Sequence, residues 1–260
     1  MRDEPPARHL APRPHVIDIL PGMTEIRALL FDVFGTVVDW RSCVAREVEA
    51  LASTRGIEVD GGDFADRWRA RYQPAMEEVR SGRRPFVPLD VLHRENLDGV
   101  LADLGIDAFT TEELDELNLA WHRLDPWPDS VEGVTRLKSK FIVGTQSNGN
   151  VALMVDMAKR AGLPWDVILG AEVTGHYKPS PRSYSEACRL LGLPPEQCML
   201  VAAHNSDLAA AREACGMRTA FISRPLEFGP HRPYPKAAEP NAEYDYVASD
   251  LVDLARQLGC

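Results

Sequence analysis

The chain has 260 residues, of which 45% are hydrophobic and 26% charged, and its formal net charge is −10. This length suffices for one large domain or for a core with a smaller insertion. The negative charge argues against nucleic acid as a partner, because nucleic acid is bound by basic surfaces. The sequence has no apolar run long enough to cross a membrane and no CxxC pair or Cys/His cluster with zinc-ligand spacing. We therefore expect a cytoplasmic protein with reduced thiols and no membrane or nucleic-acid partner.

Residues 1–23 are rich in proline and lack the apolar segment of a secretory signal, so we predict a flexible N-terminal arm. A strand is predicted next, over residues 26–32, from its apolar, β-prone run. The segment that follows has apolar residues at helical spacing in four stretches. These predicted helices cover residues 43–53, 63–79, 89–104 and 111–121. A cap is expected at Thr110, which precedes Glu113 by three residues.

Beyond Pro128 the pattern changes to alternating strands and helices. Such alternation predicts a mostly parallel sheet covered by helices on both faces. The predicted strands cover residues 141–145, 167–169, 198–203 and 218–222, and the predicted helices cover 151–161, 181–191, 208–215 and 251–258. We therefore predict an α/β protein with a core of residues 24–41 and 128–260, interrupted by an all-helical cap domain of residues 42–127.

Polar residues follow several of these predicted strands. Asp32 ends the first strand, Ser147-Asn148-Gly149 follows the second, and Asp207 follows the strand at 198–203, with Lys178 in the loop between them. Each has an ordinary structural explanation, such as a turn residue, a solvated lysine or the cap of the helix predicted at 208–215. The carboxyl ends of parallel strands meet at one edge of a sheet, however, and ligands bind there. We therefore expect one site, with Asp32 as a candidate covalent nucleophile.

Together these motifs resemble the haloacid dehalogenase superfamily, over a stretch from about residue 26 to the C-terminus. The L-2-haloacid dehalogenase branch is the most similar. The motifs that carry the resemblance are Asp32-Val33-Phe34-Gly35-Thr36-Val37-Val38-Asp39, Trp68-Arg69, Ser147-Asn148-Gly149, and Tyr177-Lys178-Pro179 with Tyr184. The resemblance implies a Rossmann-like core with an inserted helical cap, and a cleft between the two.

The superfamily also contains magnesium-dependent phosphatases, which use a second aspartate two residues after the nucleophile. Phe34 stands at that position and can neither donate a proton nor bind a metal. A halide leaves without a proton, so the resemblance favours a dehalogenase with no metal and no other cofactor. Phosphonatases use a lysine of the cap, and this chain has no lysine between Arg41 and Trp127. A phosphatase-like hydrolase and a non-catalytic protein that binds a small anion remain the alternatives.

The resemblance implies that Asp32 attacks C2 of a short halogenated carboxylic acid and releases a halide ion, and that water then hydrolyses the aspartyl ester. Lys178 would keep Asp32 ionised. Thr36, Ser147 and Tyr184 would hydrogen-bond the nucleophile or the substrate carboxylate. Val33, Phe34 and Asn148 would line the substrate site, and Arg69 and Asn148 would bind the departing halide.

Two positions depart from the pattern of the branch. Ala202 stands where the branch usually has a serine. His204 stands where it usually has an asparagine, three residues before Asp207. His204 could replace the asparagine as a donor or position the hydrolytic water, with Asp207 as general base. A bulkier ring here would narrow the halide end of the pocket and favour a smaller halogen, which could include fluorine. A homodimer is possible by resemblance.

Overall fold

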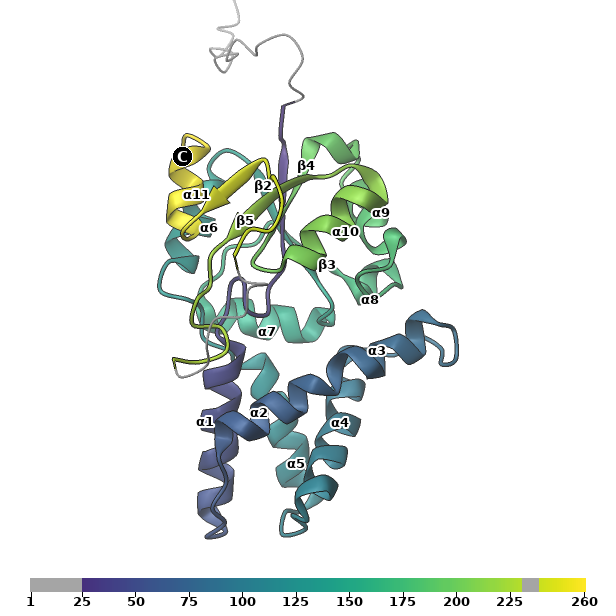
Figure 1. The fold of residues 1–260 in the computed structure, drawn as a ribbon, viewed down its shortest axis with the longest axis vertical. Coiled ribbons are helices and arrows are strands. Elements are labelled where there is room, and N and C mark those ends of the chain that lie inside the picture. Colours follow the sequence, from purple (N-terminus) through teal and green to yellow (C-terminus); the bar gives the residue numbers. More distant parts are fainter. Residues whose placement is uncertain (1–24, 231–238) are drawn as a thin grey trace, which may run out of the picture.

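The computed structural model describes residues 25–230 and 239–260, so the predicted N-terminal arm lies outside the described residues. The core is a six-stranded sheet in the order β3-β2-β1-β4-β5-β6, and every neighbouring pair is parallel (Figure 1). This confirms the predicted fold class. The strands are β1 Ala28–Phe31, β2 Ile142–Ser147, β3 Val167–Gly170, β4 Cys198–Ala202, β5 Arg218–Ile222 and β6 Tyr246–Ala248. The last of these was not predicted.

The central strand β1 is buried on both faces. Leu29 and Phe31 belong to a hydrophobic core shared with helices α6, α7 and α11, whereas Ala28 and Leu30 belong to a second core shared with α9 and α10. A strand that is covered on both faces needs apolar residues throughout, which explains the unbroken apolar run before Asp32. These helices are α6 Ser130–Lys138, α7 Val151–Ala161, α9 Pro181–Leu190, α10 Asn205–Cys215 and α11 Leu251–Gln257. Two short helices, α8 Ala171–Thr174 and η2 Pro195–Gln197, complete this part.

The helices between β1 and α6 gather at one end of the sheet, below it in Figure 1. They are α1 Trp40–Thr54, α2 Gly61–Ala70, α3 Tyr72–Arg80, α4 Leu89–Leu104, α5 Thr111–Asn118 and the 3₁₀ helix η1 Leu119–His122. The prediction of one helix over residues 63–79 is wrong, because the chain breaks at Arg71 into α2 and α3. Pro74 lies in the first turn of α3, where a missing N–H costs no helical hydrogen bond. The capping box between Thr110 and Glu113 is present.

Two segments of chain join these helices to the sheet, and they run side by side. The Asp39 amide donates to the Asp125 carbonyl oxygen at 3.0 Å, and the Trp127 amide donates to the Val37 carbonyl oxygen at 3.0 Å. Further contacts lie on α3 and on the loop after it. The Arg80 guanidinium donates to the Lys178 carbonyl oxygen at 3.0 Å. The Tyr177 hydroxyl donates to the Val87 carbonyl oxygen at 2.8 Å.

Candidate active site

Asp32 begins the loop at the carboxyl end of β1. Its amide still donates to the Val201 carbonyl oxygen at 3.0 Å, so its backbone stays tied to the neighbouring strand β4. The Thr36 hydroxyl donates to Asp32 Oδ2 at 2.7 Å and accepts the Ala203 amide at 2.9 Å. Gly35 allows this tight loop, since its φ of +84° is unfavourable for residues with a Cβ. The loop therefore fixes the carboxylate from two sides.

The Lys178 ammonium lies between two carboxylates. Its Nζ is 2.8 Å from Asp32 Oδ1 and 2.5 Å from Asp207 Oδ2, and the Lys178 side chain is only 7% exposed. Burial by itself lowers the pKa of Lys178, but the charges of Asp207 and Asp32 outweigh it and raise that pKa above its usual value. Burial likewise raises the pKa of Asp32, but Lys178 and His204 hold it well below its usual range. Asp32 is therefore ionised at neutral pH, which is the state that covalent attack by a carboxylate would require.

Asp207 lies in the first turn of α10. The helix begins at Asn205, earlier than predicted, and His204 occupies the N-cap position, so Asp207 does not cap the helix. Its Oδ1 accepts a 2.6 Å hydrogen bond from the Tyr184 hydroxyl. Tyr184 was predicted to bond the nucleophile or the substrate; the structure instead places its hydroxyl on Asp207. Burial and the neighbouring Asp207 raise the pKa of Tyr184, which stays a protonated donor.

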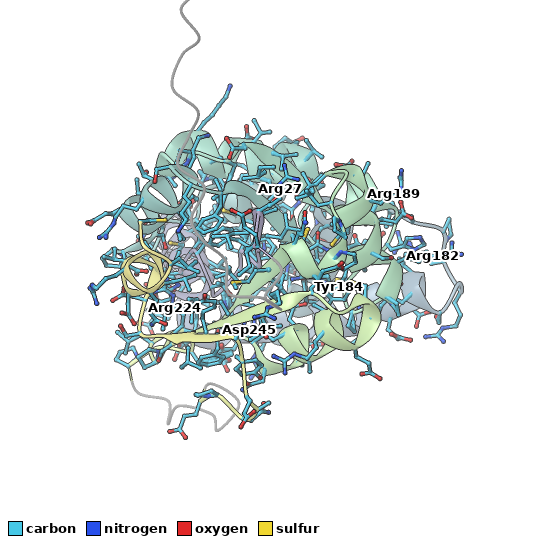
Figure 2. All side chains as sticks on the ribbon, turned by 90° about the horizontal axis from the view of Figure 1, so that it is seen from above. Arg27, Arg182, Tyr184, Arg189, Arg224 and Asp245 are labelled. Atoms are coloured by element: carbon cyan, nitrogen blue, oxygen red, sulfur yellow. The ribbon has the colours of Figure 1, made fainter. Side chains whose placement is uncertain are left out.

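Tyr184 belongs to the inward side of α9, as Figure 2 shows, whereas Arg182 and Arg189 of the same helix lie toward the periphery. The spacing of an α-helix accounts for this, because residues 182 and 189 are two turns apart on one side. Tyr184 is fully buried in the core beside β1 and β4. The helix therefore delivers a polar hydroxyl to Asp207 from an otherwise apolar layer.

His204 bridges two carboxylates. Its Nδ1 lies 3.0 Å from Asp32 Oδ2, and its Nε2 lies 3.0 Å and 3.1 Å from the two carboxylate oxygens of Glu227. Burial lowers the pKa of the imidazole, but Glu227 and Asp32 outweigh it and raise the pKa well above the usual value. Glu227 was not predicted as a site residue. Glu227 lies in the loop after β5. The sequence marks it only as an acidic residue that follows one more predicted strand.

Arg69 approaches from α2. Its guanidinium carbon lies 3.9 Å from the centroid of the Tyr72 ring and 5.8 Å from that of Phe34. Its Nη1 is buried and has no hydrogen-bond partner among the described residues. Phe34 meets Trp121 edge to face, with ring centroids 5.8 Å apart. The cation is thus surrounded by aromatic rings and keeps a donor for an anion.

A cavity of about 410 Å³ lies between the helices and the sheet edge and brings together six of the predicted site residues. Its lining residues are Asp32, Arg69, Tyr72, Gln73, Asn148, Lys178, Pro179, His204, Ser206 and Asp207. The Asn148 amide oxygen accepts the Lys178 amide at 2.8 Å, which leaves the Asn148 side-chain nitrogen as a donor.

Four predicted substrate-binding residues are not on this lining. Val33, Phe34, Ser147 and Tyr184 are buried behind it. The Ser147 hydroxyl accepts the Gly149 amide at 3.0 Å, and the Val33 carbonyl oxygen accepts the Val37 amide at 2.9 Å. Val33 and Ser147 therefore shape the loops that carry Asp32 and Asn148, and the Phe34 ring lies against the Arg69 guanidinium.

Over residues 25–230 and 239–260, no three His, Cys, Asp or Glu side chains are grouped so that they could hold a metal ion. Within the same ranges, no helix is both long and apolar enough to span a membrane.

Comparisons with known proteins agree on one family. A family model described as haloacid dehalogenase-like hydrolase matches residues 26–214. The chain is 30% identical to (S)-2-haloacid dehalogenase 4A of Burkholderia cepacia, over 77% of this chain and 84% of that protein. It is 53% identical to a solved defluorinating L-2-haloacid dehalogenase, with a TM-score of 0.87 over 90% of this chain and 96% of the other. A second solved L-2-haloacid dehalogenase is 48% identical, with a TM-score of 0.85 over 90% and 98%.

Proposed function

Because the chain belongs to the haloacid dehalogenase-like hydrolases, we propose that it hydrolyses the carbon–halogen bond of short L-2-haloacids through an ester on Asp32. The observation that carries this proposal is that an ionised Asp32 and the Arg69 guanidinium line the same cavity, and that Arg69 Nη1 has no hydrogen-bond partner among the described residues. Asp32 provides the nucleophile, and Arg69 provides a hydrogen-bond donor for the departing halide ion.

In the first step, a carboxylate oxygen of Asp32 attacks C2 of the haloacid. The new C–O bond forms as the carbon–halogen bond breaks, and the halide leaves with the bonding electrons. No proton is needed, which suits Phe34, an apolar residue two positions after the nucleophile. Arg69 and the Asn148 side-chain nitrogen stabilise the negative charge that develops on the halogen.

In the second step, water attacks Cγ of Asp32 in the ester. The bond from Cγ to the substrate oxygen then breaks, so that the 2-hydroxy acid leaves and Asp32 returns to a carboxylate. One water proton ends on the product hydroxyl, and the other is released through a general base, for which Asp207 is our candidate. Attack at C2 from the side opposite the halogen inverts that centre.

We further propose a division of labour between two domains. Residues 24–41 and 128–260 form the core with the nucleophile, and residues 42–127 form a cap that supplies Arg69. The five cysteines are unpaired in the described chain, which fits a reducing cytoplasm. The proposal also includes a homodimer, which light scattering coupled to size-exclusion chromatography tests.

The test measures free halide released from fluoro-, chloro- and bromoacetate and from both enantiomers of 2-chloropropionate, in the presence of EDTA. We expect release by the wild-type enzyme from the haloacetates and from the L enantiomer, and none by Asp32→Asn. Release of phosphate from phosphate esters with magnesium, and no halide release from any haloacid, would overturn the proposal in favour of a phosphatase.

A further inference from the structure

Glu227 is a buried carboxylate that the reaction described above does not use. The residue is 4% exposed, and it lies in the loop that follows β5. Oε1 accepts a hydrogen bond of 3.1 Å from the Trp40 indole nitrogen. Both carboxylate oxygens also face His204 Nε2. A buried carboxylate needs donors or a positive charge, and His204 can provide both.

The loop of the nucleophile is shaped to receive this carboxylate. A Cβ built on Gly35 would lie 2.2 Å from Glu227 Oε1 and 2.5 Å from Glu227 Cδ, far inside van der Waals contact. Only glycine therefore leaves room for Glu227 beside the loop that holds Asp32. The Glu227 carboxylate therefore packs directly against the loop that holds Asp32.

The hydrogen bonds of His204 determine where its protons lie. The carboxylate oxygens of Glu227 accept a hydrogen bond from Nε2–H. The ionised carboxylate of Asp32 accepts a hydrogen bond from Nδ1–H. Both ring nitrogens are therefore donors, and His204 is an imidazolium. The ring is 29% exposed and lines the cavity, so it lies within reach of the reacting groups.

The two oxygens of Asp32 consequently differ. Oδ2 accepts two hydrogen bonds, at 2.7 Å from Thr36 and at 3.0 Å from His204. Oδ1 accepts one, at 2.8 Å from Lys178. The oxygen with fewer donors keeps more electron density available for attack on carbon.

We propose that Glu227 is a positioning residue that aims the Nδ1 proton of His204 at Asp32 Oδ2, so that Oδ1 attacks the haloacid and Oδ2 becomes the ester carbonyl oxygen. When water attacks Cγ, the carbonyl electron pair moves onto Oδ2. His204 and Thr36 already donate to that atom, so they form the oxyanion hole of the second step. This inference rests on the proposed function and assigns Glu227 to the hydrolysis of the ester.

The inference predicts which step suffers when the charge of Glu227 is removed. In Glu227→Gln the amide fills the same space, but it no longer stabilises a cation on His204. We expect ester formation to continue and ester hydrolysis to slow by about tenfold or more. With chloroacetate, halide should appear in a stoichiometric burst followed by a slow phase, and the ester should accumulate in the intact-protein mass spectrum.

The pH dependence provides a readout that a purely structural role would not change. The charged and titratable groups around His204 are Asp32, Glu227, Asp207, Lys178 and, from the cap, Arg69. Of these, Glu227→Gln alters only one negative neighbour, so the pKa of His204 falls. The imidazolium is lost as pH rises through its pKa, so the alkaline limb of kcat moves to lower pH. The ¹⁵N chemical shifts of His204 in the resting enzyme report the same change without substrate.

Two further variants make the test decisive. In a His204→Asn background, Glu227→Gln should change kcat by no more than roughly twofold, because the residue acts through His204. Asp90→Asn is the matched control: Asp90 is also a carboxylate paired with a histidine, His122 at 3.1 Å, but it is not among the cavity-lining residues. This variant should release halide without a burst, as the wild-type enzyme does, and should keep the alkaline limb of kcat unchanged.

Several results would overturn the inference while leaving the proposed function intact. One is a pH profile of kcat in Glu227→Gln that equals that of the wild-type enzyme, and another is an equal slowing of ester formation and ester hydrolysis. The others are an unchanged titration of His204 and losses of kcat that multiply in the double variant. The failure of the wild-type enzyme to release halide from every haloacid would instead refute the proposed function itself.

Discussion

Replacement of Lys178 by methionine tests the charge balance of the site. The ammonium is 2.8 Å from one carboxylate and 2.5 Å from another, and all three side chains are nearly buried. At an effective dielectric constant of about 20, a contact of 2.8 Å is worth about 6 kcal/mol of Coulomb attraction. Much of this is offset by the cost of burying the three charges. In the variant, the buried carboxylates of Asp32 and Asp207 lose their cation. Removing one partner of a buried ion pair in this way lowers the unfolding free energy by about 3–5 kcal/mol.

The loss of unfolding free energy in Lys178→Met should be larger at neutral pH than at acid pH. In the wild-type protein, the lowered pKa of Asp32 stabilises the fold above the pKa of the unfolded carboxyl, and this stability is lost as pH falls through the folded pKa. In Lys178→Met the charge of Lys178 no longer opposes burial and only His204 still lowers the pKa of Asp32, so that pKa rises and the stability gained from ionised Asp32 is smaller. The difference in unfolding free energy is therefore largest near pH 7 and shrinks toward about pH 4.

Urea unfolding of both proteins, followed by circular dichroism at several pH values, measures this difference. The melting temperature should fall by on the order of 10 °C at neutral pH. Lys138→Met is the control, because its partner Asp166 is about a third exposed, and a surface pair contributes at most about 1 kcal/mol. A loss below about 1 kcal/mol in Lys178→Met, or one that is constant from pH 7 to pH 4.5, would refute the reasoning.

Three other substitutions test separate parts of the site. His204→Asn should widen the pocket and lower the kcat/KM ratio of fluoroacetate to bromoacetate by about tenfold, and an unchanged ratio counts against a steric role of the ring. Gly35→Ala should cost more unfolding free energy than Gly56→Ala, because only the new Cβ at position 35 meets Glu227. At Gly56 nothing lies within 4 Å of the new Cβ, so backbone strain alone predicts a loss of about 1 kcal/mol. Equal losses in urea unfolding would show that the clash with Glu227 is absent. Arg69→Lys should lower kcat by about tenfold in steady-state halide release while the melting temperature stays close to wild type, because an ammonium cannot stack on Tyr72 or offer a planar fork of donors.

The order of strands and helices was predictable because each element carries its own local pattern. The central strand is apolar throughout and Gly35 lies in the loop that follows it, whereas Ser147-Asn148-Gly149 marks the end of β2. The break at Arg71 was missed although Pro74 marked it, because the apolar spacing continues across both helices. Strand β6, of three residues, is too short for a pattern to reveal.

The site was predictable where a motif stands next to a strand end, as for Asp32 and Asp207. The partners of these groups were less predictable. Glu227 meets Trp40 across a separation of 187 positions, and no local pattern encodes that contact. Tyr184 was identified by resemblance, but its actual partner depends on how α9 and α10 pack together. Sequence thus indicated the chemical groups, and tertiary packing determined their hydrogen bonds.

The contacts between the helices and the sheet have a consequence for the charge balance of the site. The two connecting segments are hydrogen-bonded to each other between Asp39 and Asp125 and between Val37 and Trp127, so their backbones support one another. Arg80 of α3 also donates to the carbonyl oxygen of Lys178, whose ammonium lies on Asp32. The position of α3 is therefore linked, through one backbone hydrogen bond, to the residue that holds Asp32 ionised.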